Sequence, residues 1–136
     1  MNKKYLVAVY GSLRKTMGNN SYYLSNSEYK GVFSTIPEYT LHSMSAFPGL
    51  KLNGNHSIVM EVYEVNEETL KNLNKLEGYD PNKIPTFYDR IEINTPWGKA
   101  FTYIYVNNLS EDSIVESGDW VTFKNKKKSW VSVTNN

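Results

Sequence analysis

Cysteine is absent from this sequence of 136 residues, and other features that would mark particular classes of protein are scarce. Without cysteine the chain forms no disulfide, carries no thiol nucleophile and offers no thiolate ligand to a metal. The two histidines, His42 and His56, have no carboxylate at ligand spacing, so we expect no metal site. Each of them is interpreted as an ordinary strand or loop residue.

An excess of charge of either sign is also missing, because 15 basic residues balance 14 acidic ones to a formal net charge of +1. This balance provides no electrostatic reason to expect binding to nucleic acid or to an anionic membrane surface. No apolar run approaches the ~20 residues of a membrane-spanning helix. No signal-peptide pattern precedes the first apolar segment. We therefore expect a soluble, cytoplasmic protein with neither nucleic acid nor membrane as its partner.

Tyrosine is abundant, with 11 residues, and together with valine and isoleucine it favours strands. The length predicts one domain, residues 1–136, with a real hydrophobic core. Alternating and apolar patterns predict strands at residues 5–9, 29–36, 39–44, 57–65, 87–94, 99–106, 120–123 and 130–133. Residues 45–50 are predicted to be a turn, and residues 53–55 (Asn-Gly-Asn) a hairpin tip.

A single segment predicts a convincing helix. Asn66 is a good N-cap, two acidic residues follow it in the first turn, and Gly78 is a natural terminator. Leu70, Leu73 and Leu76 supply the apolar side. We therefore expect an α+β fold, in which a mainly antiparallel sheet closes into a small β-barrel and this helix packs on it.

The turn Tyr10-Gly11-Ser12-Leu13-Arg14 directly follows the apolar strand predicted at residues 5–9. Glycine lets other groups approach the backbone closely, and bare N–H groups at such a turn bind anions. The turn does not match the phosphate-binding Gly-x-x-x-x-Gly-Lys loop, and Arg14 breaks the Gly-x-Ser-x-Gly pattern of a nucleophilic serine. It is interpreted as an anion-binding strand end or as no more than a strand end.

Glu77 shares one helical face with Leu70 and Leu73, because these positions have i, i+3, i+7 spacing. An inward carboxylate at a helix C-terminus is desolvated and meets the negative end of the helix dipole, and both effects raise its pKa. A raised pKa suits a glutamate for general base and acid work near neutral pH. The alternative interpretation is a solvated glutamate at a fraying helix end.

The order of these motifs resembles the gamma-glutamylcyclotransferase-like (AIG2-like) family. The resemblance extends from Tyr5 to about Trp120 and covers nearly the whole chain. Its main motifs are the Tyr10 to Arg14 turn, the strand at residues 59–65, the helix ending at Leu73-Asn74-Lys75-Leu76-Glu77-Gly78, and Tyr88-Asp89-Arg90. Phe47-Pro48-Gly49-Leu50 and Ser117-Gly118-Asp119-Trp120 also fit the family.

The resemblance implies a barrel of six or seven strands with one main flanking helix, short extra helices and a cavity. By the same resemblance Glu77 is the acid/base glutamate and Tyr88 lines the pocket. The backbone that holds the α-carboxylate of the substrate is that of Tyr10, Gly11, Ser12 and Leu13. Family members release a gamma-glutamyl group as 5-oxoproline and need no metal or organic cofactor. The partner implied is a small gamma-glutamyl compound, and we expect a monomer or a small homo-oligomer.

Two positions depart from the family pattern, which often has glycine at Met60 and commonly aspartate at Asn74. Met60 is a candidate for reshaping the cavity. Arg14 is interpreted either as a solvated loop residue or as the partner of a second substrate carboxylate, and Arg90 as a surface charge. Two other functional classes stay open: a small-molecule binding or sequestering protein on the same barrel without turnover, and a structural domain that binds partners through its tyrosines.

Overall fold

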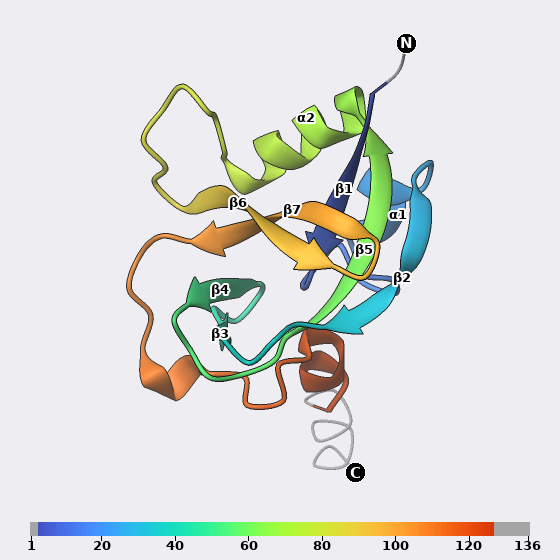
Figure 1. Cartoon of the computed structure of the whole chain (residues 1–136). Coiled ribbons are helices and arrows are strands. Elements are labelled where there is room, and N and C mark those ends of the chain that lie inside the picture. Colours follow the sequence, from blue (N-terminus) through green and yellow to red (C-terminus); the bar gives the residue numbers. More distant parts are fainter. Residues whose placement is uncertain (1–2, 127–136) are drawn as a thin grey trace.

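The structure, a computed structural model, describes residues 3–126. Five strands form one sheet in the order β2-β5-β1-β7-β6, and β3 pairs with β4 in a separate two-stranded sheet (Figure 1). The strands are β1 (Lys4–Val9), β2 (Glu28–Ser34), β3 (Tyr39–Ser43), β4 (Pro48–Leu52), β5 (Val59–Asn66), β6 (Tyr88–Thr95) and β7 (Gly98–Tyr105). The helices are α1 (Asn20–Leu24), α2 (Glu67–Glu77), a single 3-10 turn (Glu111–Ser113) and a helical segment at residues 120–126.

The large sheet is mixed but mainly antiparallel. β5 pairs antiparallel with both β1 and β2, and β6 pairs antiparallel with β7. β1 and β7 run parallel, with Val7 opposite Phe101. The α+β class with a mainly antiparallel sheet is therefore confirmed.

The closed barrel expected from the sequence is not shown, because β2 and β6 end the five-stranded sheet of the described residues as edges. The β3–β4 hairpin does not join these edges as a further strand. It is tied to the rest of the chain by isolated bridges, Tyr39 with His56 and His42 with Ile114, and by the burial of Leu41 and Leu50. Side-chain packing rather than a continuous hydrogen-bonded ladder thus holds the hairpin in place.

The two faces of the large sheet are covered by different layers. Successive residues of a strand point to opposite faces, so Val7 on β1 packs with Leu73 of α2, while Ala8 packs in a second cluster with Leu41 and Trp120. Figure 1 shows α2 on one side of the sheet, and the β3–β4 hairpin with the C-terminal helical segment on the other. Among the described residues, no helix has the length and apolar character needed to cross a membrane.

The helix α2 agrees with its prediction at both ends. The Asn66 side chain accepts a hydrogen bond from the N–H of Thr69 at 2.8 Å, and Gly78 ends the helix in the left-handed conformation with φ of 70°. Glycine adopts this conformation without the steric cost that a Cβ brings. Leu70 and Leu73 are buried, as expected for the apolar face, whereas Leu76, expected on the same side, is 37% exposed because it lies in the last turn of the helix at the cavity.

Three strand and turn predictions are wrong. Residues 48–52 are the strand β4 rather than part of a turn, and the tip of the β3–β4 hairpin therefore falls at residues 44–47 instead of 53–55. Residues 120–123 are helical, because the Asp119 side chain accepts a hydrogen bond from the N–H of Thr122 at 3.2 Å and caps a helix there. The strand predicted at residues 130–133 lies outside the described residues.

Candidate active site

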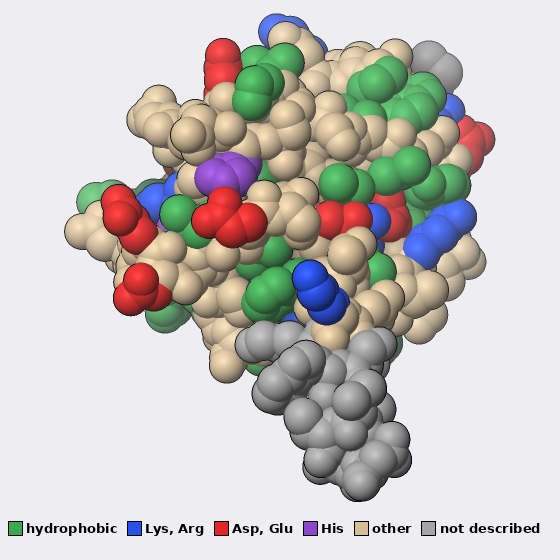
Figure 2. Space-filling view, turned by 90° about the horizontal axis from the view of Figure 1, so that it is seen from below, with side chains coloured by type: hydrophobic (Ala, Val, Ile, Leu, Met, Phe, Trp, Pro, Cys, Tyr) green, Lys and Arg blue, Asp and Glu red, His purple; other side chains and the backbone are tan. Residues whose placement is uncertain are grey.

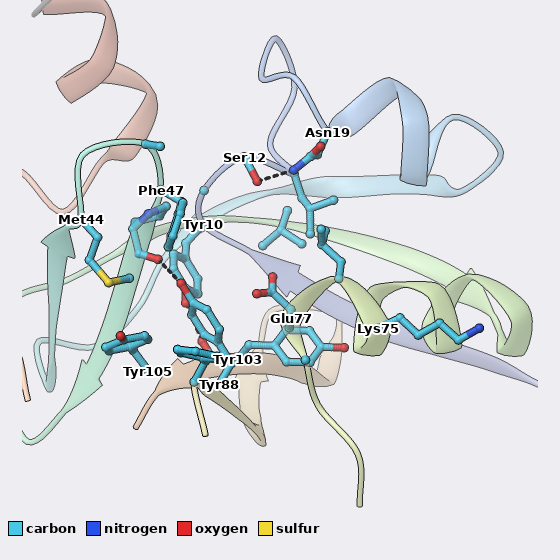
Figure 3. Close-up of a pocket in the computed structure, with 18 of the residues that line it drawn as sticks. Tyr10, Ser12, Asn19, Met44, Phe47, Lys75, Glu77, Tyr88, Tyr103 and Tyr105 are labelled. Atoms are coloured by element: carbon cyan, nitrogen blue, oxygen red, sulfur yellow. Dashed lines mark hydrogen bonds between the residues drawn. The ribbon is translucent and has the colours of Figure 1, made fainter. Parts of the chain in front are cut away.

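A cavity of about 560 Å³ opens where the turn after β1 meets the end of α2 (Figure 3). Small-molecule sites commonly have volumes of ~300 to 1,000 Å³. The remaining walls come from the β3–β4 connection and from β6 and β7. The lining residues are Ala8, Val9, Tyr10, Gly11, Ser12, Leu13, Asn19, Met44, Ala46, Phe47, Pro48, Lys75, Leu76, Glu77, Gly78, Phe87, Tyr88, Tyr103 and Tyr105. Every site residue predicted from the sequence is therefore among the residues of this one cavity.

The turn at one wall is shaped by close packing and by local hydrogen bonds. A Cβ at Gly11 would lie 2.6 Å from Cγ of Pro48, so only glycine fits against the start of β4. Asn19 fastens the turn from outside, because its side-chain amide donates to Oγ of Ser12 at 2.9 Å and its N–H donates to the Ser12 carbonyl at 3.0 Å. These contacts hold the turn in one shape before any ligand arrives.

The backbone N–H groups of this turn are available to a ligand. Within the part of the chain that the structure describes, the N–H groups of Gly11, Ser12 and Leu13 donate no hydrogen bond to another protein group. Adjacent N–H groups of this kind form a concave site for an anion. This arrangement is consistent with the anion-binding geometry predicted for the strand end. The role of each of its residues in binding stays a prediction.

Glu77 is the last residue of α2, and Figure 3 shows its carboxylate turned into the cavity. Burial raises the pKa of this carboxyl group to about 7. No hydrogen bond or ion pair involves the carboxylate among residues 3–126, so its charge has no partner to lower the pKa again. A carboxyl group with this pKa exchanges its proton readily at neutral pH, as a general base and acid must.

Three tyrosines around Glu77 are held by their own hydroxyl groups. Tyr10 donates to the Tyr103 carbonyl at 2.6 Å, Tyr88 donates to the Pro48 carbonyl at 2.8 Å, and Tyr103 donates to Oδ1 of Asn74 at 2.5 Å. Burial raises the pKa of each of these phenols, and the charge of Glu77 adds to the effect. The three side chains therefore stay neutral, and their hydrogen bonds hold them in place as walls of the cavity around the carboxylate.

Sequence reasoning missed several residues of the cavity: Asn19, Met44, Ala46, Phe47, Phe87, Tyr103 and Tyr105. Most of them come from connections between elements, where no periodic pattern marks the direction of a side chain. Tyr103 and Tyr105 had a usable signal, since both lie on the same face of the strand predicted at residues 99–106. The pattern did not indicate which of the two faces meets the end of α2.

Arg14 differs from both interpretations of its sequence position. It is buried, and its guanidinium forms ion pairs with Glu61 at 2.8 Å and with Asp119 at 2.7 Å. It is therefore neither a solvated loop residue nor a free partner for a substrate carboxylate. Burial acts to raise the pKa of Asp119, but the hydrogen bonds from Arg14 and Thr122 outweigh it and lower that pKa.

Two further residues singled out from the sequence lie outside the cavity wall. Met60 is fully buried in the core cluster with Ala8 and Trp120, so it does not reshape the cavity directly. The guanidinium of Arg90 lies over the ring of Phe101, 4.0 Å from its centroid, and donates to Oδ1 of Asn74 at 3.4 Å. Its stem and head thus pack against the protein surface beside α2.

The histidines have structural partners. One ring nitrogen of His42 lies 2.8 Å from Oγ of Ser113, and burial lowers the pKa of the ring. His56 pairs with Glu116 at 2.9 Å. Over residues 3–126, no cluster of three or more histidine, aspartate and glutamate side chains is arranged to hold a metal ion.

The fold and the cavity together define a class: a small α+β protein with a cavity lined by one unpaired carboxyl group and a turn of free N–H groups. The comparison with protein families is specific. A family model described as gamma-glutamyl cyclotransferase, AIG2-like, matches residues 7–122. The chain belongs to this family.

Individual relatives agree with this assignment. A Vibrio cholerae protein that bears the family's name is 43% identical over 117 residues, which cover 86% of this chain and 96% of that one. The gamma-glutamylcyclotransferase family protein YtfP of Escherichia coli K12 is 36% identical over 115 residues, covering 85% and 95% of the two chains. The gamma-L-glutamyl-butirosin B gamma-glutamyl cyclotransferase of Niallia circulans is 32% identical over 119 residues, covering 85% and 75%.

Solved structures show the same fold. A crystal structure of a Pyrococcus horikoshii protein superposes with a TM-score of 0.75 at 28% identity, covering 92% of this chain and 97% of that one. The solution structure of ytfP from Escherichia coli gives a TM-score of 0.65 at 35% identity, covering 88% and 98%.

Proposed function

We propose that this protein cyclises the gamma-glutamyl group of a small gamma-glutamyl amine or peptide to 5-oxoproline and releases the free amine. The observation that carries the proposal is that the Glu77 carboxyl group, with a pKa of about 7, lines the same cavity as the free N–H groups of Gly11, Ser12 and Leu13. The Glu77 carboxyl group suits proton transfer, and the N–H groups suit the binding of a carboxylate. A gamma-glutamyl compound has both an α-amine that must lose a proton and an α-carboxylate.

The α-carboxylate of the substrate is assigned to the turn after β1. There the N–H groups of residues 11–13 donate to it, and the glycine lets it approach the backbone. Fixing this end directs the rest of the glutamyl chain toward Glu77 and the tyrosine walls. The reaction is intramolecular, so holding the chain in a folded conformation removes much of the barrier.

The chemical step moves one proton and exchanges one carbon–nitrogen bond for another. The neutral α-amine attacks the γ-carbonyl carbon, and its proton passes to the Glu77 carboxylate. The bond from that carbon to the leaving nitrogen then breaks as Glu77 returns the proton to this nitrogen. The products are 5-oxoproline and the free amine, and Glu77 ends as the carboxylate it was at the start.

The Niallia circulans relative supports a gamma-glutamyl amine as substrate, because its name states that it acts on gamma-L-glutamyl-butirosin B. The low charge of the cavity fits the same chemistry. Among the residues of the described chain that line the cavity, only Lys75 and Glu77 are charged, and Glu77 is the acid assigned to proton exchange.

The test is a panel of gamma-glutamyl compounds in which 5-oxoproline and the released amine are both quantified. We expect product from at least one compound, and we expect Glu77→Gln to lower kcat by at least about a hundredfold, the usual contribution of a positioned general base. Glu68→Gln is the matched control, since Glu68 is an exposed acid on the same helix.

Two outcomes would overturn the proposal. One is a folded wild-type protein that releases no 5-oxoproline from any compound. If it is nevertheless stabilised thermally by one of them, the protein is a binder without turnover. The other is a Glu77→Gln variant with wild-type activity.

A further inference from the structure

Three exposed apolar side chains gather at the cavity. Phe47 is 48% exposed, Phe87 58% and Leu76 37%, and all three line it. Single exposed apolar residues are common on protein surfaces, but a group of them around one concave site indicates a binding surface. Two of the three are phenylalanines from separate connections, so the chain brings them together only in the folded state.

The cavity has two chemically different ends, and the Glu77 carboxylate faces both of them. In Figure 3, Ser12 and Asn19 lie above the Glu77 carboxylate, and Met44, Phe47 and Tyr105 lie to its left. The first end includes the free N–H groups that suit the α-carboxylate. The second end is left for the leaving group, because the reacting γ-carbonyl must be near Glu77.

The second end lacks a charged partner for a leaving group. Lys75 and Glu77 are the only charged residues among the described residues that line the cavity. Figure 3 shows the Lys75 side chain running along α2 away from the carboxylate of Glu77. Lys51 and Lys124 lie beside this end but outside the lining, where they donate to the carbonyls of Tyr105 at 2.7 Å and Ser45 at 3.1 Å. An ammonium or carboxylate carried by the leaving group would therefore lose water without gaining an ion pair from the lining of this end, and such desolvation is costly.

We propose that the leaving group of the substrate is an apolar amine, with an aromatic or branched aliphatic group seated against Phe47, Phe87 and Met44. The inference rests on the function proposed above and adds the chemical class of the released amine. Binding energy from this group is available for the reaction because it anchors the leaving nitrogen beside Glu77.

The test compares four gamma-glutamyl amides that share the glutamyl part and differ only in the amine: phenethylamine, isoamylamine, methylamine and 1,4-diaminobutane. We expect kcat/KM for the phenethyl and isoamyl amides to exceed that for the methyl amide at least about tenfold, the usual gain from filling an apolar pocket. The diaminobutane amide has the reach of a large amine but carries a charge. We expect it to fall well below the phenethyl amide.

Phe87→Ala and Phe47→Ala test the assigned surface. Each is expected to lower the ratio of kcat/KM for the phenethyl amide to that for the methyl amide by about tenfold. Ile84→Ala is the matched control, because Ile84 is 91% exposed, lies three residues before Phe87 and does not line the cavity. It should keep the wild-type ratio.

The results separate this inference from the proposed function. Equal turnover of all four amides would overturn the apolar leaving group while leaving the cyclisation established. A preference for the diaminobutane amide would also overturn it and would indicate a cation bound to the aromatic rings. Failure to release 5-oxoproline from any of the four amides and from the wider panel would instead remove the proposed function itself.

Discussion

At the scale of single residues, Glu77 is the carboxylate that the tertiary structure places in an unusual environment. By contrast, Glu61 and Asp119 both pair with Arg14. Glu77 has the cavity and the rings of Tyr88 and Tyr103 around it. A buried charge without a partner destabilises the fold, so this residue is expected to cost stability at the pH where it is ionised.

The pH dependence of stability follows from that cost. Burial raises the pKa of Glu77 to about 7, whereas a glutamate in an unfolded chain has a pKa of about 4.3. Between these values the folded state binds more protons than the unfolded state, so the free energy of unfolding falls as the pH rises. We expect Glu77→Gln to be more stable than the wild type by about 3–4 kcal/mol at pH 8 and equally stable at pH 4, measured by urea unfolding.

Glu68→Gln is the control for the same experiment, because Glu68 is exposed at the start of the same helix. It should show no gain that grows between pH 4 and pH 8. A Glu77→Gln variant no more stable than the wild type at pH 8 would contradict the buried, unpaired state of this carboxylate.

At the scale of elements, the turn after β1 is fastened to distant segments through one side chain. Arg14 pairs with Glu61 on β5 and with Asp119 at the start of the helical segment 120–126. Glu61 also accepts hydrogen bonds from the N–H of Lys15 at 2.9 Å and from the hydroxyl of Tyr63 at 3.0 Å. The anion-binding wall of the cavity is thus held from behind by a buried network.

Removing the central cation tests this network. We expect Arg14→Ala to lower the free energy of unfolding by about 3–5 kcal/mol, because it leaves a buried carboxylate without its partner. Lys30→Ala is the comparison, since Lys30 pairs with Glu28 at the exposed edge strand β2, where an ion pair contributes about 0–1 kcal/mol. Equal losses of stability in urea unfolding for the two variants would contradict the role given to Arg14.

The element scale also shows where local sequence was sufficient. Both ends of α2 were predicted, because an asparagine cap and a terminal glycine act on their own neighbours along the chain. The aromatic and β-branched side chains of residues 120–123 favour a strand, but the Asp119 side chain before them caps a helix. Trp120 is almost fully buried, so tertiary packing outweighs strand propensity there.

At the scale of the whole molecule, the cavity joins parts that are distant in sequence: the turn after β1, the β3–β4 connection, the end of α2, and β6 with β7. Figure 2 shows one face of the molecule, seen from below relative to Figure 1, on which acidic, basic and apolar side chains are interspersed. A ligand that binds the folded state alone stabilises all of these parts together.

A substrate analogue provides the corresponding measurement. In a glutaric acid monoamide, hydrogen replaces the α-amine of a gamma-glutamyl amide, so the compound has no nucleophile for cyclisation and binds without turnover. We expect it to raise the unfolding free energy by about 2.7 kcal/mol at a hundred times its Kd. The same analogue with its α-carboxylate converted to a neutral amide should bind at least about tenfold more weakly, since charged hydrogen bonds to N–H groups contribute about 1.5–3 kcal/mol. Equal affinity for both compounds, by calorimetry, would exclude the turn as the carboxylate site.

The sequence by itself determined the features that depend on near neighbours. These are the helix with its caps, the spacing that puts Glu77 on the helical face of Leu70 and Leu73, and the glycine turn after the first strand. The ordered motifs also led to the correct family. For the helix caps, the face of Glu77 and the glycine turn, the physical cause acts between residues only a few positions apart.

The tertiary structure alone decided what depends on long-range packing. It places β1 parallel to β7, leaves the sheet open at β2 and β6, and buries Arg14 between two carboxylates. It also brings Phe47 and Phe87 to one cavity from two separate connections. No local sequence pattern predicts these features, because each depends on how segments far apart in the chain pack against one another.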